Sequence, residues 1–504
     1  MNLFPRALAR VSALLATILL LDSGTAFGGG PTITVNDAGD TTNACATTGA
    51  GTCTLRDAMT YANAHAGSTI AFDIAGSGVQ TITPQSIYPT ITAPVTIDGF
   101  TQPGSSANTN GPGLPDNSVH RIEVSGAALM TDGLVLGAGS DGSVIRGLVT
   151  NHWYSRDITL SSDFNTIAGN FIGTDPTGAN GQPGNASNVG VFVFAPSASH
   201  NIVGGTAPAD RNLVSGHPSQ GITVYVTTGL TIEGNFIGTD ATGTLAIPNG
   251  LGITTTSGSN VIGGTTSGAG NLISGNTTYG ISFGGPLTGL VQGNLIGTDL
   301  TGTHPLPNVQ GPGILLNNAT GVTIGGAAAG AGNVISANGS AGIVADNGSN
   351  HVIQGNFIGT DVTGTLPLGN AFSAATFGGI FLDGTSSTLI GGGNPGEGNV
   401  IAYNQGNGVT IFGFGTETGI TVRGNVIHDE APFPAVLHPQ LAIDITDDGP
   451  TPNDPCDTDE GSNHLQNYPI VTSAAPQGGG THITGVLNST ASTQFTLDFY
   501  GNPQ

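Results

Sequence analysis

The 504-residue chain contains 84 glycines, and 8 basic residues stand against 32 acidic ones, which gives a formal net charge of −24 at pH 7. Charged residues make up 8 % of the chain, against about 25 % in an average domain. This composition excludes a long helical protein and, without a glycine at every third position, collagen; the shortage of basic groups excludes nucleic acids and anionic membrane surfaces as partners. A glycine-rich, acidic β protein remains.

Residues 1–26 are predicted to be a secretory signal, because two arginines precede an apolar run from 11 to 21 and small residues follow. An uncleaved anchor is the alternative. No later segment is apolar for long enough to span a membrane, so we expect a secreted protein, extracellular or at the cell surface. Since secretion permits disulfides, Cys45 and Cys53 are predicted to form one, with Cys456 left unpaired.

Residues 31–132 are expected to form a cap and the first irregular turns of the fold that follows. Apolar residues recur there at the spacing of one helix face, which predicts a short helix: Leu55, Ala58, Met59 and Ala62. A repetitive fold needs its open end covered, both for solubility and to block the addition of further strands. We therefore expect this helix to cap the N-terminal end.

Residues 133–445 are a repeat. The sequence Gly-Asn-Phe/Leu-Ile-Gly-Thr-Asp starts at Gly169, Gly234, Gly293 and Gly355, and a related unit with Ile-Gly-Gly or Val-Gly-Gly lies between successive copies. The true unit is therefore about 30 residues long in two alternating forms, which is the period of a solenoid. Each unit holds three short β-like runs and no helix. This pattern predicts an all-β parallel β-helix with three short strands per turn and about eleven regular turns.

Two stacked rows of side chains are predicted inside this solenoid. The apolar row leads the first strand of each turn: Leu134, Ile158, Val191, Ile222, Ile253, Ile281, Ile314, Ile343, Ile380 and Val409. The polar row is a structural ladder of buried amides that bond one another from turn to turn: Asn170, Asn212, Asn235, Asn271, Asn294, Asn333, Asn356, Asn399 and Asn425. Nearly all of these asparagines follow a glycine, whose backbone suits a sharp corner.

A carboxylate follows alternate ladder asparagines by five residues, at Asp175, Asp240, Asp299, Asp361 and Glu430. Neighbours in this row should lie two turns, or about 10 Å, apart, which is too far for one cation to bridge them or for a catalytic pair. The sequence Thr-Asp-x-Thr-Gly favours a turn in which the Asp side chain bonds the backbone two residues on. A row of weak cation or carbohydrate contacts is the alternative.

The densest polar and aromatic group in the repeat is a candidate carbohydrate-binding cluster: His152, Trp153, Tyr154, Arg156 and Asp157. An exposed Trp and Tyr would stack on a sugar ring while Arg and Asp bond its hydroxyls. A surface loop with a local Arg–Asp contact is the alternative. The pattern matches no recognisable catalytic constellation, so catalytic residues stay unknown.

The chain changes character after the repeat. Residues 446–466 form an acid-rich loop whose carboxylates suit calcium, with a solvated acidic loop as the alternative: Asp447, Asp448, Asp454, Asp457 and Asp459. Calcium is the cofactor that the sequence suggests, and none is required. Residues 467–504 are expected to be the start of a truncated β-domain, in which 481–487 and 494–500 pair as a hairpin.

The sequence Cys-Thr-Leu-Arg-Asp-Ala at 53–58 resembles the motif of the CSLREA-domain proteins, with Thr and Asp in place of Ser and Glu. The segment 89–104 and the Gly-Asn-Phe-Ile-Gly-Thr-Asp repeats are similar to the same family, so the resemblance covers nearly the whole mature chain. It implies a secreted bacterial protein with a right-handed parallel β-helix of the pectin-lyase type. It implies no known activity and brings no catalytic residues.

Two functions are consistent with these features. The first is a non-catalytic rod that acts as an adhesin, a matrix protein or a carbohydrate-binding surface, with a polysaccharide or cell-surface glycan as its partner. The second is a polysaccharide lyase or a glycoside hydrolase, which rests mainly on analogy between folds. The near-uniform repeat without a charged cluster favours the first function, and the oligomeric state does not follow from the sequence.

Overall fold

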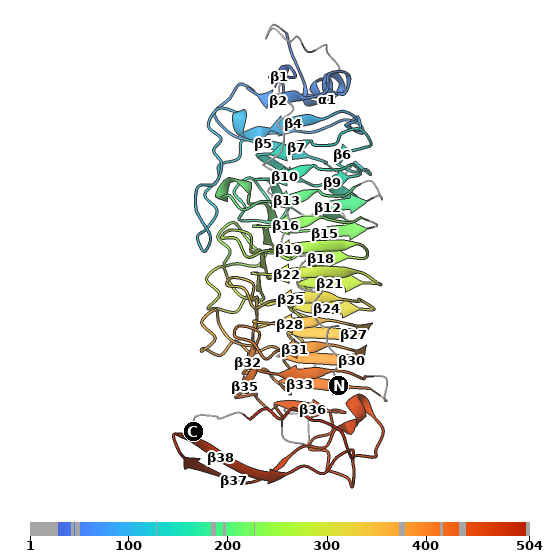
Figure 1. Ribbon diagram of the computed structural model, residues 1–504. Coiled ribbons are helices and arrows are strands. Elements are labelled where there is room, and N and C mark those ends of the chain that lie inside the picture. Colours follow the sequence, from blue (N-terminus) through green and yellow to red (C-terminus); the bar gives the residue numbers. More distant parts are fainter. Residues whose placement is uncertain are drawn as a thin grey trace, which may run out of the picture.

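The computed structural model describes residues 29–41, 45, 51–127, 129–182, 188–194, 198–225, 227–371, 378–413, 417–432 and 440–499. Within them the chain winds as a right-handed parallel β-helix, and Figure 1 shows the resulting rod, with α1 near one end and the C-terminal strands at the other. Each regular turn adds one strand to each of three parallel sheets, named A, B and C in the order in which the chain visits them. The predicted fold class is confirmed.

Sheet A has 13 strands: β1 (Thr32–Val35), β2 (Ser68–Phe72), β4 (Val95–Asp98), β7 (Val144–Arg146), β10 (Thr166–Ala168), β13 (Ile202–Gly204), β16 (Thr231–Glu233), β19 (Ser259–Gly263), β22 (Thr288–Gln292), β25 (Val322–Gly325), β28 (Val352–Gln354), β31 (Leu389–Gly391) and β34 (Thr421–Arg423). Sheet B has 12 strands: β3 (Gln80–Ile82), β5 (Ile122–Ser125), β8 (Leu148–Asn151), β11 (Phe171–Ile172), β14 (Leu213–Val214), β17 (Phe236–Ile237), β20 (Leu272–Ile273), β23 (Leu295–Ile296), β26 (Val334–Ile335), β29 (Phe357–Ile358), β32 (Val400–Ala402) and β35 (Val426–His428). Sheet C has 11 strands: β6 (Leu134–Leu136), β9 (Arg156–Leu160), β12 (Val189–Phe194), β15 (Gln220–Tyr225), β18 (Leu251–Thr255), β21 (Ile281–Gly284), β24 (Ile314–Asn317), β27 (Ile343–Ser349), β30 (Ile380–Ser386), β33 (Val409–Phe412) and β36 (Ile443–Ile445).

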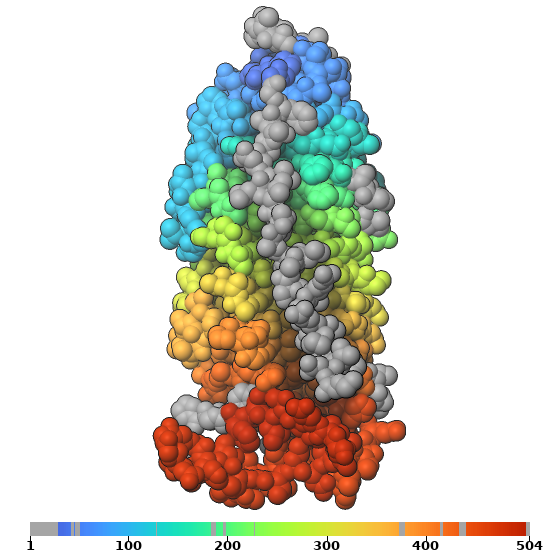
Figure 2. Space-filling view, viewed as in Figure 1, coloured from blue at the N-terminus to red at the C-terminus, as the bar shows by residue number. Residues whose placement is uncertain are grey.

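The core fills the inside of the rod, where side chains of like kind stack from turn to turn. The predicted apolar row is confirmed on sheet C, because Ile222 pairs in register with Val191 on one side and Ile253 on the other, and all three are fully buried. Alternation along each strand sends the intervening residues outward. Figure 2 shows the turns as stacked bands of colour along the rod.

The predicted asparagine ladder is confirmed at the corner between sheets A and B. The Nδ2 of each member donates to Oδ1 of the next at 2.8–3.1 Å, from Asn170 to Asn425. The glycine before a ladder asparagine is required by the corner: Gly293 has φ +69°, and a Cβ there would lie 2.4 Å from the carbonyl oxygen of Gly264. Much of the glycine content is therefore a condition for tight coiling.

A second asparagine ladder, not expected from the sequence, runs along the corner between sheets B and C. Its Nδ2 atoms donate to the next Oδ1 at 2.8–3.0 Å, in the order Asn249, Asn276, Asn308, Asn338, Asn370 and Asn404. Glu430 ends this ladder, where its Oε2 accepts from the backbone N–H of Asn404 at 2.7 Å. The expectation that Glu430 continues the row of turn carboxylates is therefore wrong, because it stands in for the next ladder oxygen.

The position of Glu430 predicts a pH-dependent stability. Burial, and to a lesser degree Asp429, raises the pKa of this carboxyl from 4.5 to about 8. A raised folded-state pKa adds stability below pH 4.5 that is lost as the pH rises towards 8. We expect Glu430→Gln to be more stable than the wild type by roughly 2 kcal/mol at pH 8, after discounting for the partly exposed side chain, and equal to it at pH 4. Melting temperatures measured from pH 4 to 9 test this, with Glu460→Gln at an exposed position as the control. The same dependence of melting temperature on pH for Glu430→Gln and the wild type would contradict it.

The predicted turns, with the Asp side chain bonded to the backbone two residues on, are confirmed at Asp175 and Asp299, whereas Asp240 and Asp361 accept from backbone N–H groups four and five residues on. In one of them, Asp299 Oδ1 accepts from the backbone N–H of Thr301 at 3.1 Å and from its hydroxyl at 2.7 Å. These long loops fold back over the outer face of sheet B and bury a second apolar cluster outside the rod: Val149, Phe171, Leu213, Phe236, Ala241, Leu272 and Leu300. Sheet B is therefore covered on both faces.

The N-terminal end follows the prediction. Helix α1 (Leu55–Ala64) buries Leu55, Ala58, Met59 and Ala62, and the Thr54 side chain caps it by accepting from the backbone N–H of Asp57. The Cys45–Cys53 disulfide is present, and Cys456 is free and exposed. A 3-10 turn, η1 (Gly99–Thr101), follows β4; a second, η2 (Pro208–Asp210), lies between β13 and β14. The predicted signal at 1–26 lies outside the described residues.

The C-terminal hairpin exists and the predicted strand at 481–487 is present, but the predicted partner strand at 494–500 is wrong. Strand β37 (Ile470–Gln477) pairs antiparallel with β38 (Gly480–Val486), and residues 494–499 are not a strand. Gly478 and Gly479 both have positive φ, as a two-residue hairpin turn requires, and this is the signal that the prediction passed over. A 3-10 turn, η3 (Ser462–Leu465), precedes the hairpin. In the described part of the chain, no helix is both long and apolar enough for a membrane span.

Candidate functional site

The carbohydrate-binding cluster predicted at 152–157 is split by the structure. Trp153 is fully buried, and its Nε1 donates to the Thr150 hydroxyl at 2.9 Å. Its ring fills the space beside Gly126 and Gly133, where a Cβ would lie 2.7 Å from the indole. Asp157 is also fully buried. The expectation that these two side chains face a ligand is wrong, because both point into the rod.

The other three members of that cluster lie near the surface, and of these only Arg156 belongs to a strand of sheet C. His152 is half-buried with Nδ1 2.8 Å from Asn151 Oδ1, and Tyr154 is half-buried too. Arg156 starts β9 and forms an ion pair with Asp132 at 3.1 Å, with the arginine side chain 36 % exposed. Its guanidinium carbon lies 3.9 Å from the ring centre of Phe192. Arg156 therefore belongs to a surface that the sequence analysis did not anticipate.

That surface is an aromatic strip on the outer face of sheet C, made of Phe192, Phe194 and Tyr225. In β12 the inward residues are Val191 and Val193, so alternation turns both phenylalanines outward. Phe192 and Phe194 stack at 5.7 Å between ring centres, and Phe194 stacks on Tyr225 of the next turn at 5.7 Å. Phe194 is 42 % and Tyr225 46 % exposed. With Arg156 at its edge, the strip is a flat aromatic platform with hydrogen-bonding groups beside it.

The outer face of sheet C continues down the rod with small hydroxyl residues. Thr223, Thr254 and Ser282 pair in register on successive strands below Phe192. Further down, Asp346 and Asp383 are register partners on β27 and β30. Burial, and the nearby charges of Asp346 and Glu417, raise the pKa of the Asp383 carboxyl. The face thus carries an aromatic end and an acidic end.

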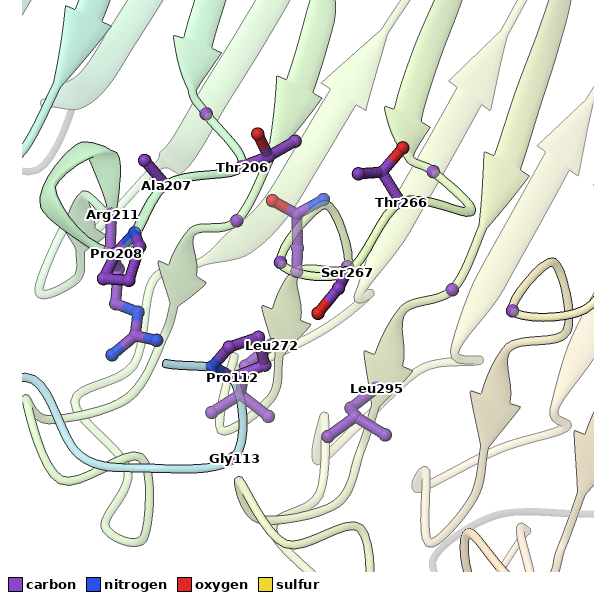
Figure 3. A pocket seen from close by; sticks show the side chains of 18 of the residues that line it. Pro112, Gly113, Thr206, Ala207, Pro208, Arg211, Thr266, Ser267, Leu272 and Leu295 are labelled. Atoms are coloured by element: carbon purple, nitrogen blue, oxygen red, sulfur yellow. The ribbon is translucent and has the colours of Figure 1, made fainter. Parts of the chain in front are cut away.

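A groove of about 280 Å³ lies beside sheet B (Figure 3). The groove is lined by Thr206, Thr266 and Ser267 together with Leu272 and Leu295 of the sheet. The long loop between β4 and β5 contributes Pro112. Arg211 closes one end. Its side chain is almost wholly buried, donates to the carbonyl oxygens of Leu114 and Gly111 at 3.1 and 3.3 Å, and lies 4.4 Å from the Phe236 ring. Because these donors are engaged, the groove has no free charge for a ligand.

The acidic loop after the repeat brings together three of the five predicted calcium ligands. Among the described residues, the carboxylates of Asp454, Asp457 and Asp459 offer oxygens within 4.8 Å of one another. Asp447 and Asp448 are not in this group, because their carboxylates accept instead from Asn407 at 3.0 Å and Thr446 at 2.8 Å. An all-oxygen set of three carboxylates fits a hard divalent cation such as calcium.

The comparisons with known proteins are sparse. No protein-family model and no curated protein matches the chain, so the resemblance to CSLREA-domain proteins stays a prediction. The A-module of mannuronan C-5 epimerase AlgE4 from Azotobacter vinelandii is 12 % identical over 77 % of this chain and 89 % of its own, with a TM-score of 0.37. Tailspike protein 2 of bacteriophage CBA120, enzymatically active domain, is 13 % identical over 81 % of this chain and 52 % of its own, with a TM-score of 0.32. Likeness at this level carries no argument about activity.

Fold and surface together define a parallel β-helix rod with exposed aromatic side chains at one place on its outer surface. Sheet B is covered by its own loops, and the aromatic strip stands on the outer face of sheet C.

Proposed function

We propose that this protein is a secreted or cell-surface rod that binds carbohydrate without catalysis, through the aromatic strip and the Arg156–Asp132 pair. The observation that supports it most is the exposed stack of Phe194 on Tyr225 across two turns. Aromatic faces bury the apolar C–H faces of sugar rings with little entropy cost, because such side chains have few rotatable bonds. The pair supplies both a donor and an acceptor for sugar hydroxyls.

The platform is rigid, which favours binding over turnover. Phe192, Phe194 and Tyr225 project from strands whose inward neighbours are fully buried and paired on both sides. A preorganised surface loses little freedom when it binds. Since Phe192 and Phe194 follow one strand across the rod and Tyr225 lies on the next turn, the proposed ligand is an extended chain on the surface rather than a single sugar in a pocket.

Loss of the aromatic strip is expected to abolish this binding. Tyr225→Ala and Phe194→Ala should each weaken retention on the preferred glycan by at least about tenfold, since each removes one stacking face. Affinity electrophoresis against a panel of polysaccharides measures this. Tyr468→Ala, which removes an aromatic residue 53 % exposed near the hairpin, is the matched control and should change nothing. Equal retention of all variants, or no retention of any glycan by the wild type, would contradict the proposal.

A polysaccharide hydrolase is the second candidate function, and Asp346 with Asp383 is the observation that favours it. The two residues are register partners on strands spaced about 4.8 Å apart, a spacing that lets their carboxyls approach to the roughly 5–5.5 Å found in retaining glycosidases. Burial and neighbouring acids raise the pKa of Asp383, as a general acid needs. New reducing ends released by the wild type and lost in Asp383→Asn would establish this function in place of the non-catalytic one.

We also propose that the acidic loop holds calcium through Asp454, Asp457 and Asp459. Calcium at a hundred times its dissociation constant should stabilise the folded loop by about 2.7 kcal/mol and so raise the melting temperature, with chelator reversing the effect. Asp459→Asn should remove the response, while Asp448→Asn, outside the group, should keep it. A melting temperature that is the same in calcium and in chelator would contradict this proposal.

A further inference from the structure

The described part of the chain has almost no free positive charge. Four of its arginines form ion pairs with aspartates: Arg56 with Asp40, Arg146 with Asp98, Arg156 with Asp132, and Arg423 with Asp498. Arg211 is buried and bonded to backbone carbonyls. Arg121 is the remaining described arginine, and its Nε approaches the Gly104 carbonyl beside sheet B rather than sheet C. The chain has no lysine, and among the described arginines Arg156, the one beside the aromatic strip, is paired with an aspartate.

The face that carries the aromatic strip is itself acidic. Asp132 accepts both from Arg156 and from the Thr159 hydroxyl at 3.1 Å, so the arginine beside the strip brings no net charge. Asp346 and Asp383 add negative charge farther along the same outer face. The chain as a whole carries −24. A polyanion lying along sheet C would meet like charge and find no unpaired cation.

We infer that the ligand of the aromatic strip is an uncharged polysaccharide, bound by ring stacking and hydroxyl hydrogen bonds and not by ion pairs. This inference rests on the proposed function. The Arg156–Asp132 pair can form hydrogen bonds with sugar hydroxyls in both directions. The guanidinium is held over Phe192 and has N–H groups to donate to a hydroxyl, while the carboxylate accepts from one. The strands that follow carry the uncharged residues Thr223, Thr254 and Ser282 at the register positions below Phe192, so they add no cation to this face.

Polysaccharide pairs that differ only in charge test this inference. Polygalacturonate is compared with its fully methyl-esterified form, and carboxymethylcellulose with hydroxyethylcellulose, by affinity electrophoresis at 20 and 500 mM NaCl. We expect the neutral member of a bound pair to be retained at least tenfold more strongly, with no change between the two salt concentrations. Tighter retention of the anionic member, weakened by salt, would overturn the inference and leave the proposed carbohydrate binding intact. Retention of neither member of any pair, nor of any other glycan, would overturn both.

A charge variant makes the test independent of the choice of sugar. Asp132→Asn removes the acid beside Arg156 while Asn still offers an oxygen to Thr159 and to the guanidinium. We expect this variant to gain salt-sensitive retention of the anionic member, because Arg156 is then unneutralised. Asp498→Asn is the control, because it frees Arg423, which lies away from the strip. This variant should not gain retention of the anionic member that depends on Tyr225. An Asp132→Asn variant with wild-type preference for each pair would overturn the inference.

Discussion

Alanine in place of Asn294 is expected to lower the free energy of unfolding by about 4 kcal/mol or more. The Asn294 amide donates to the carbonyl oxygens of Ile262 and Gln292 and to Asn333 Oδ1, all at 2.9–3.0 Å. Its own oxygen accepts from the backbone N–H and the side-chain amide of Asn271. Alanine leaves these groups without partners inside the rod, and each unsatisfied buried group costs about 1–3 kcal/mol.

Urea unfolding followed by far-UV circular dichroism measures this loss. Asn317→Ala is the matched control, because Asn317 lies on the exposed outer face of β24 and outside both ladders; it should change stability by less than about 0.5 kcal/mol. Asn308→Ala in the second ladder should cost about as much as Asn294→Ala, since its amide also bonds the next ladder oxygen and a core carbonyl. A loss below about 1 kcal/mol for Asn294→Ala would show that the ladder adds little stability.

The two ladders show which parts of this fold can be predicted from the sequence. The first lies where a glycine, an asparagine and a short apolar strand follow in fixed order, so its members align without knowledge of the loops. The second lies in loops of variable length, and its members follow residues as different as Gly275, Pro307 and Tyr403. Its period appears only once the turns are aligned in space. The period of the strands was enough to predict the rod. It was not enough to predict the hydrogen bonds of the second ladder, because these join loops of different length.

The functional surface was harder to predict than the fold, for a physical reason. Which side of a β-helix strand faces out follows from alternation, so Phe192 and Phe194 could have been identified as outward residues next to Val191 and Val193. Trp153, in contrast, lies in a corner without alternation, and its burial depends on the absence of side chains at Gly126 and Gly133. A lone tryptophan near charged residues therefore suggested a surface that the corner geometry excludes.

At the N-terminal end of the second ladder, two residues differ from those at equivalent positions in the other turns, and each supplies part of what the other lacks. The residue before the inward apolar residue of sheet C is glycine in most turns, as at Gly190 and Gly221, and Asp157 replaces it. His217 replaces a ladder asparagine, with Nδ1 3.0 Å from Asn249 Oδ1. Histidine has no oxygen to accept from Asn188, whose Nδ2 donates instead to Asp157 Oδ1 at 2.8 Å.

The second carboxylate oxygen of Asp157 lies 3.8 Å from His217 Nε2, and both side chains are fully buried. Asn249 Oδ1 can only accept, so the proton on the ring side that faces it is on Nδ1. Asp157 Oδ2 and His217 Nε2 are both buried without a hydrogen-bond partner in the described part of the chain, and their separation is too long for a hydrogen bond between them.

Restoring the repeat at both positions is expected to cost little, whereas changing either one alone should cost about 3 kcal/mol. Asp157→Gly orphans the Asn188 amide, and His217→Asn removes the imidazole that lies beside the buried carboxylate. The double variant Asp157→Gly with His217→Asn places a ladder oxygen below Asn188 and a glycine where most turns have one, so its stability should return to within about 1 kcal/mol of the wild type. Urea unfolding of the four proteins gives the coupling. Additive losses would show that the two departures are independent.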